Sequence, residues 1–149
     1  MGSEHELTVD PDKLTEVLAS RLAAIVPDGF HVRAADGMLW YACESGRFPG
    51  QLNNYSPGAA GTYVRNNFEA HAEQLSEAQS AATVARQALD ELQDYVDEAT
   101  HDPWPGTVRP PWPFAEVRGE TLHLWYGGPK ASDEPLLACE PVPLASLHR

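Results

Sequence analysis

The stretch Val64–Ala99, VRNNFEAHAEQLSEAQSAATVARQALDELQDYVDEA, decides the fold of this 149-residue chain. It contains neither glycine nor proline, and apolar residues recur along it at alternating steps of four and three. This period of about 3.5 residues is typical of a seam packed against another helix. The sequence therefore predicts one long helix over 62–101, with a seam formed by Val64, Phe68, His71, Leu75, Ala78, Ala82, Ala85, Leu89, Leu92 and Val96.

The length of this helix bears on the oligomeric state. At about 1.5 Å per residue the stretch 64–99 would be roughly 54 Å long, whereas a compact domain of this size is roughly 40 Å across. We therefore expect a symmetric homodimer in which the seam of one chain covers that of the other. The alternative is a kink near Ser76 or within 80–83, which would give two shorter helices folded on one core.

Two elements are predicted before the long helix. Asp10-Pro11 is a helix start signal, and the apolar residues that follow it fall on one helical face. A hairpin is then expected, with strands over 30–35 and 38–43 around Asp36-Gly37, a dipeptide that suits a tight type I′ turn. Residues 1–9 are expected to form a disordered tail, and 44–61 a long loop.

The segment after the long helix is rich in proline and tryptophan. Residues 103–113 are expected to form an extended connector whose tryptophans cover Trp40 or Trp125. A second hairpin follows, with strands over 114–117 and 122–126, and proline residues bracket an edge strand over 136–140.

This order of elements predicts the fold class. It is an α+β fold of two layers, formed by one domain over residues 1–149. A twisted antiparallel sheet of four to five strands (two hairpins plus the edge strand) carries a short N-terminal helix and one long helix on one face.

The two hairpins share a short pattern. Val32-Arg33, five residues and Leu39-Trp40-Tyr41 match Val117-Arg118, five residues and Leu124-Trp125-Tyr126. Each hairpin also follows a helix. Two interpretations are open: an internal duplication, or the ordinary preference of half-buried hairpins for aromatic and β-branched residues.

Composition narrows the classes of function. The formal net charge of −12 and pI near 4.7 disfavour nucleic acid and anionic membrane surfaces as partners. Two cysteines, Cys43 and Cys139, are too few for a disulfide framework or a four-thiolate metal site. With no apolar run near 18 residues and no signal-peptide pattern at the start, a reduced, cytoplasmic protein is expected. Arginine outnumbers lysine eight to two, which suggests a GC-rich bacterial coding sequence.

Motifs that carry chemistry are missing from the sequence. The six histidines lack zinc-site spacing, and no nucleophile or dinucleotide-binding motif occurs. We therefore assign no catalytic, cofactor-binding or metal-ligating residues, and the balance is against an enzyme.

Two functions remain in view. The first is a non-enzymatic interaction or adaptor protein that is homodimeric through the long helix and binds another, unidentified protein. The element order, size and acidity resemble those of small secretion chaperones, a resemblance of topology that implies a dimeric client-binding surface. The alternative is a small-ligand-binding domain, or an enzyme, with a pocket between sheet and helix lined by Trp40, Tyr41, Trp125 and Tyr126, with Arg33, Arg118 and His123 as polar anchors.

Overall fold

The structure, a computed structural model, describes residues 7–43, 61–100, 102–106 and 111–149. Its α-helices are α1 (Pro11–Ala23), α2 (Val64–Ala72) and α3 (Glu77–Thr100). Its strands are β1 (Phe30–Ala35), β2 (Met38–Cys43), β3 (Gly61–Tyr63), β4 (Trp112–Arg118), β5 (Thr121–Gly127), β6 (Leu137–Ala138) and β7 (Val142–Pro143). A short 3-10 helix, η2 (Leu144–Leu147), follows β7.

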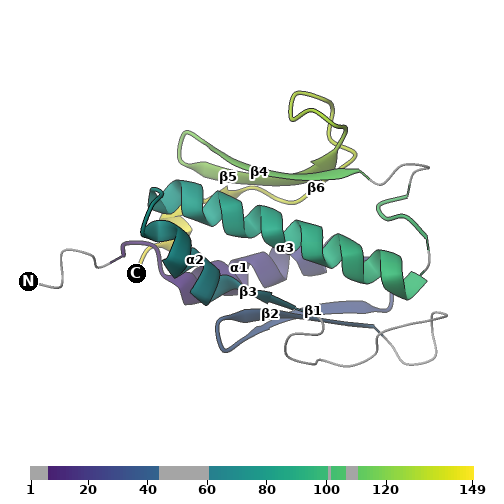
Figure 1. The fold of residues 1–149 in the computed structure, drawn as a ribbon, viewed down its shortest axis with the longest axis horizontal. Coiled ribbons are helices and arrows are strands. Elements are labelled where there is room, and N and C mark those ends of the chain that lie inside the picture. The colour runs from purple at the N-terminus through teal and green to yellow at the C-terminus, as the bar shows by residue number, and fades with distance from the viewer. Residues whose placement is uncertain (1–6, 44–60, 101, 107–110) are drawn as a thin grey trace, which may run out of the picture.

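The predicted α+β class is confirmed, with antiparallel hairpins, a short N-terminal helix and a long helix. The structure differs from the expected two layers because the hairpins belong to separate sheets. One sheet has the order β1-β2-β3, and the other has β4-β5-β6 with β7 also paired to β5. Figure 1 shows the helices as a middle layer between these two sheets.

The width of the buried surface on α3 explains the two sheets. Its buried positions include Val84, Ala88 and Tyr95 as well as the expected Ala85 and Leu89. At 100° per residue the main buried arc covers roughly 180° of the helix, far more than a narrow seam. One sheet cannot cover so wide an arc, so each sheet packs on one side of it.

Two tyrosines, one from each sheet, bind the backbone of α3. The Tyr41 hydroxyl on β2 donates to the Ala88 carbonyl at 3.3 Å, and the Tyr126 hydroxyl on β5 donates to the Leu89 carbonyl at 2.6 Å. Both side chains are almost completely buried. The two sheets therefore bind successive carbonyls of one helix from two sides.

The predicted long helix is interrupted. Helix α2 ends at Ala72, and α3 begins at Glu77 with Ser76 at its N-cap. The Gln79 amide donates to Ser76 Oγ at 3.1 Å, and the Ser76 amide donates to Gln79 Oε1 at 3.3 Å. This reciprocal pair is a capping box, which starts a new helix rather than continuing the old one. Of the two expected alternatives, the one with a kink near Ser76 is therefore correct. The start of the expected 62–101 helix also differs, because Thr62 lies in β3, and residue 101 is outside the described residues.

The first hairpin has the predicted register and turn. Arg33 pairs with Trp40, and the positive φ angles of Asp36 (54°) and Gly37 (72°) fit the type I′ turn. Strand β3 was not expected. It pairs with β2 at Gly61, where a Cβ atom would lie 2.5 Å from the Leu39 carbonyl oxygen, so only glycine allows this approach.

A strict duplication of the hairpins is not supported by their registers. In the first hairpin Val32 pairs with Tyr41, at the far end of the shared pattern. In the second hairpin the equivalent Val117 pairs with Leu122, and Tyr126 pairs with Pro113. The shared letters thus occupy different pairing positions in the two sheets.

The N-terminal segment is fixed from residue 7 onward, which corrects part of the expected disordered tail. Val9 is buried, bridges to His148 and donates its amide to Glu77 Oε1 at 2.6 Å. The Arg149 amide also donates to the Thr8 carbonyl. Residues 1–6 lie outside the described residues, as do residues 44–60 of the expected loop 44–61, whose last residue, Gly61, begins β3.

The described part of the connector 103–113 packs on α3 and β5. Trp104 makes an edge contact with Tyr126, at 5.1 Å between ring centroids. A cover of the connector tryptophans over Trp40 or Trp125 stays a prediction. Gln93 on α3 donates to the carbonyls of Trp104 and Pro111 and so ties the connector to the helix. Trp112 is 59% exposed.

The capping box gives a stability test for the interruption between α2 and α3. Ser76→Ala removes the side-chain acceptor at the N-cap and should lower the free energy of unfolding by about 1 kcal/mol. In a continuous helix the same change would be neutral or stabilising, because alanine is the better helix former. Urea unfolding measures the difference, with Thr83→Ala, a change inside α3, as the control.

Candidate functional site

The predicted seam is divided between the core and the surface. Six of its members are at most 1% exposed and pack inside the chain: Val64, Phe68, Ala85, Leu89, Leu92 and Val96. The two sheets and α2 therefore cover the apolar face of α3, which we expected a second chain to cover. The other four members, His71, Leu75, Ala78 and Ala82, remain partly or fully exposed around the α2–α3 turn.

Three of these exposed members line an apolar groove. Leu75, Ala78 and Ala82 face Ala115 and Val117 of β4 across a cavity of about 550 Å³. Gln79, Thr83 and Glu116 complete the lining and form a polar rim. Leu75 is 38% exposed, a high value for a leucine, and the small alanines leave the groove open.

The upper wall of this groove is an edge strand. Among the described residues β4 pairs only with β5. The orientation of β5 follows from its other neighbours, because the Leu136 amide donates to the Tyr126 carbonyl at 2.8 Å and the Cys139 amide to the Leu124 carbonyl at 3.0 Å. The backbone groups of Leu124 and Tyr126 thus point away from β4.

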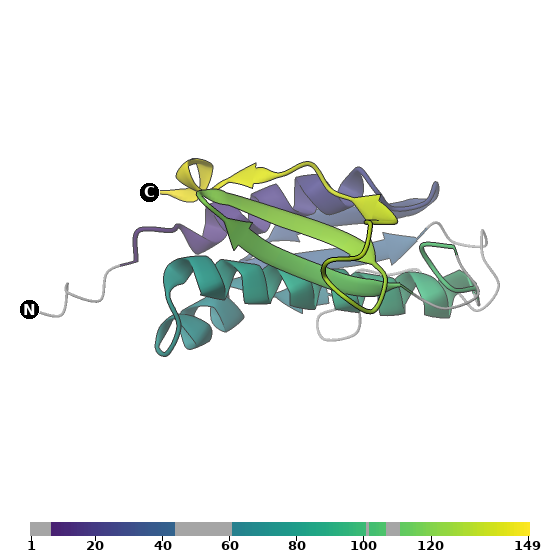
Figure 2. The ribbon, with the colours of Figure 1, turned by 90° about the horizontal axis from the view of Figure 1, so that it is seen from above.

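Alternation along the strands then fixes the direction of each backbone group on β4. Trp125 pairs with Phe114 as a hydrogen-bonded pair, so the backbone groups of Ala115 and Val117 point away from β5, toward the free edge. Pro113 lies on the same side and has no N–H to offer. The free edge therefore presents two N–H groups, from Ala115 and Val117, directly above the groove. Figure 2 shows β4 crossing over α3 at this edge of the sheet.

A second cavity lies on the outer face of the same sheet. It has a volume of about 700 Å³ and is lined by Glu116, Arg118 and Trp125 together with the loop 131–135. The Arg118 guanidinium lies 5.2 Å from the centre of the Trp125 ring and pairs with Glu116, and Phe114 stacks against the same indole. Trp125 is buried, and its Nε1 has no hydrogen-bond partner among the residues that the structure describes.

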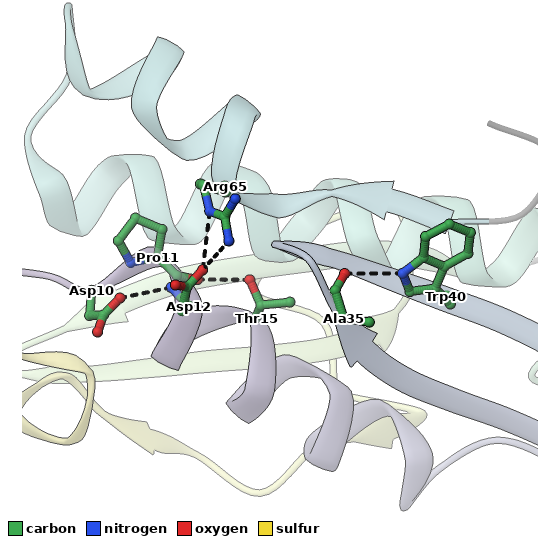
Figure 3. A network of polar contacts seen from close by, with 7 residues as sticks. All are labelled: Asp10, Pro11, Asp12, Thr15, Ala35, Trp40 and Arg65. Atoms are coloured by element: carbon green, nitrogen blue, oxygen red, sulfur yellow. Dashed lines mark hydrogen bonds and ion pairs between the residues drawn. The ribbon is translucent and has the colours of Figure 1, made fainter. Parts of the chain in front are cut away.

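Only two of the seven predicted pocket residues meet in that cavity, namely Trp125 and Arg118. Tyr126 points to the opposite face, onto α3, while Trp40, Tyr41 and Arg33 belong to the other sheet. His123 is on the outer face beside Glu116 but does not line the cavity. The seven residues therefore do not form one pocket together, because they are divided between two sheets and Tyr41 and Tyr126 pack on α3. The Trp40 side chain is bound within its own hairpin, where its Nε1–H donates to the Ala35 carbonyl at 3.1 Å (Figure 3).

Figure 3 also shows a polar cluster that joins α1 to the start of α2. Arg65 donates to Asp12 Oδ1 from Nε (3.1 Å) and from Nη2 (2.8 Å). The hydrogen bond and charge of Asp12 raise the pKa of Arg65. The Arg65 amide donates to the Gly37 carbonyl, so the cluster clasps the first hairpin turn. Asp12, Arg65 and Gly37 also line a cavity of about 230 Å³. Because these residues bind one another, we assign them a structural role and no ligand.

A hydrogen-bond chain links β2, β3 and α3 and runs from the buried Tyr41 and Thr62 to the exposed Glu91. Tyr41 Oη lies 2.7 Å from Thr62 Oγ1, which donates to Glu91 Oε1 at 2.6 Å. Burial raises the pKa of Glu91, the Thr62 hydrogen bond lowers it, and the charges of Asp90 and Asp94 raise it. Burial likewise raises the pKa of the Tyr41 hydroxyl well above its usual range. Tyr41 therefore stays neutral, and Glu91 holds a proton more tightly than in the unfolded chain.

Two features of other functional classes are absent from the described ranges. These residues contain no group of three or more His, Cys, Asp or Glu side chains that could hold a metal ion. Within the same ranges, none of the helices combines the length and the apolar character needed to cross a membrane. Comparison with known proteins gave no match to a family model, to a curated protein or to a solved structure.

The raised pKa of Glu91 predicts how stability depends on pH. A carboxyl whose pKa is raised by folding stabilises the native state below its ordinary value of 4.5, and this contribution is lost as the pH rises through the raised value. The free energy of unfolding should therefore fall as the pH is increased from about 4.5 toward neutrality. Glu91→Gln, which keeps an acceptor for Thr62, should reduce this fall in urea titrations at several pH values. Glu16→Gln on α1 controls for the loss of one charge, and equal slopes for the two variants would contradict the prediction.

Proposed function

We propose that this chain is a protein-binding module that captures an extended segment of another polypeptide by strand addition at the free edge of β4. The observation that carries the proposal is the pair of outward-pointing N–H groups of Ala115 and Val117 above an apolar groove. Strand addition uses backbone hydrogen bonds for affinity and pockets for alternate side chains for specificity.

The groove provides such pockets. An added strand would lie about 4.8 Å from β4, and every second side chain of it would point toward α3. Those side chains would lie above Ala78 and Ala82, whose small size leaves room between helix and sheet edge. Burial of apolar side chains there would add to the energy of the backbone hydrogen bonds.

This proposal retains the expected interaction or adaptor class, including a chaperone-like role, but moves its surface. Dimerisation through a helix over 62–101 is not part of it, because most of the predicted seam is buried within one chain. We place the protein in the cytoplasm because its two cysteines, Cys43 and Cys139, are too few for the disulfide framework that is typical of small secreted domains.

Peptide selection with a blocked edge tests the proposal. Peptides selected from a phage-displayed random library on the wild-type protein should lose at least tenfold in affinity against Ala115→Pro. The proline removes an outward N–H and places its ring in the path of an added strand. Because the Ala115 N–H makes no bond to β5, the fold should tolerate this change. Glu116→Pro, by contrast, should destabilise the protein because its N–H belongs to the β4–β5 ladder.

A second variant tests the groove without altering β4. Ala82→Phe fills the cavity and should also weaken the selected peptides at least tenfold, whereas Glu98→Phe, an exposed position on the same helix, should not. Binding is measured by fluorescence anisotropy, and folding of each variant by urea unfolding. If the selected peptides bind the wild type and both blocked variants equally, the edge of β4 is not the binding site.

A small-ligand site is the second candidate function, and the outer-face cavity of about 700 Å³ favours it. Its lining combines the guanidinium of Arg118 with the carboxylates of Glu116, Asp133 and Glu134 and with the side chain of Trp125. A mixture of amino acids and monosaccharides should then shift the indole N–H resonance of Trp125 in NMR spectra, and the shift should saturate with concentration. The resonance is assigned by its loss in Trp125→Phe. Unchanged spectra at millimolar concentrations would remove this candidate.

A further inference from the structure

We propose that the segment captured at β4 is basic, with a lysine or arginine between two apolar residues. This inference rests on the proposed function and names the chemistry of its partner. Its evidence is the order of side chains along the open part of β4 and the charge that surrounds them.

The apolar positions follow from the strand geometry. Ala115 and Val117 send their backbone groups to the free edge and their side chains toward α3, where they line the groove. Residues of an added strand directly opposite them present side chains on the same face. Two partner side chains, two residues apart, would therefore enter the groove and should be apolar.

The basic position follows from Glu116. Its side chain lies between these two positions and points to the outer face, so it would lie beside the central residue of the partner segment. Arg118 Nε donates to Glu116 Oε1, and no described residue donates to Oε2. The Glu116 side chain remains 44% exposed, which leaves this second oxygen accessible. An ammonium or guanidinium group is the natural donor to it.

The surroundings of Glu116 are negative as well. Among the described residues, the lining of the adjoining cavity has three carboxylates, from Glu116, Asp133 and Glu134, and one cation, Arg118. The whole chain carries a formal net charge of −12, which attracts basic partners and repels acidic ones. The charges around Glu116 and the net charge of the chain thus both favour a basic segment.

The same charges disfavour a second copy of the chain as the occupant. A twofold pairing of β4 with β4 that bonded all the free N–H groups of Ala115 and Val117 would centre on Glu116. The two Glu116 side chains would then be directly opposed, which is unfavourable across strands. Two chains of charge −12 would also repel each other.

Synthetic peptides test this chemistry. Blocked peptides of sequence GSTVKVTSG, GSTVEVTSG and GSTVVKTSG place a lysine between two valines, replace it with glutamate, or break the alternation. The wild-type protein should bind the first at least fivefold more tightly than either of the others, in NMR or anisotropy titrations. Its affinity should decrease as salt is raised, because an exposed charge pair is screened.

Charge reversal at Glu116 provides the matched variant. Glu116→Lys should reverse the preference between the lysine and glutamate peptides, whereas Glu16→Lys on α1 makes the same charge change elsewhere and should leave the preference intact. Ala115→Pro should weaken all three peptides alike.

The failures of the two proposals can be told apart. Suppose that the peptides bind and that Ala115→Pro abolishes their binding, but that the lysine peptide is not preferred or the glutamate peptide is. The inference of a basic segment is then contradicted, and the proposal of strand addition is still supported. If none of the peptides binds, or if Ala115→Pro has no effect on their binding, both proposals are contradicted. A dimer detected by sedimentation and abolished by Ala115→Pro would make a second copy the occupant instead and overturn this inference.

Discussion

The packing of two sheets on one helix is the constraint on which the rest of this structure depends. Helix α3 is buried over about half its circumference, and each sheet covers one side of that surface. Tyr41 and Tyr126 reach it from opposite sheets and donate to the carbonyls of Ala88 and Leu89. For the Tyr126 hydroxyl, loss of this acceptor would cost about 1–3 kcal/mol of desolvation, so its bond helps to fix the position of the second sheet along the helix. Tyr41 is held in place by Thr62 Oγ1 as well as by the Ala88 carbonyl.

Local signals in the sequence were sufficient for most of the elements. Asp10-Pro11 marks the start of α1, and Asp36-Gly37 marks the turn of the first hairpin, as the structure confirms. The interruption before α3 was also encoded locally, since Ser76 and Gln79 form a capping box three residues apart. The seven-residue apolar period continues across this box, because α2 folds back and buries Val64 and Phe68 in the same core as α3. Periodicity alone therefore could not reveal the break.

The division into two sheets and the position of the candidate site were not accessible in the same way. Apolar residues beside the seam, such as Val84 and Ala88, indicated a wide buried arc, but which strands cover it depends on contacts distant in sequence. The shared Leu-Trp-Tyr pattern was informative about faces, because Tyr41 and Tyr126 both turn toward α3. It was misleading about a common pocket, since Trp40 and Trp125 lie on separate sheets and Tyr41 and Tyr126 are buried against α3. The groove was missed because it requires the edge of β4 to lie over alanines of α3.

The openness of that edge is itself restricted by sequence. Exposed edge strands invite indiscriminate pairing, and proteins limit it with proline, charge and short length. On β4 Pro113 removes a donor at one end, and the charged Arg118 occupies the other. Only Ala115 and Val117 offer N–H groups between them, so a partner can form few backbone bonds and must gain the rest of its affinity from side chains in the groove. The residues that protect the edge against aggregation thus make recognition depend on the side chains of a short segment.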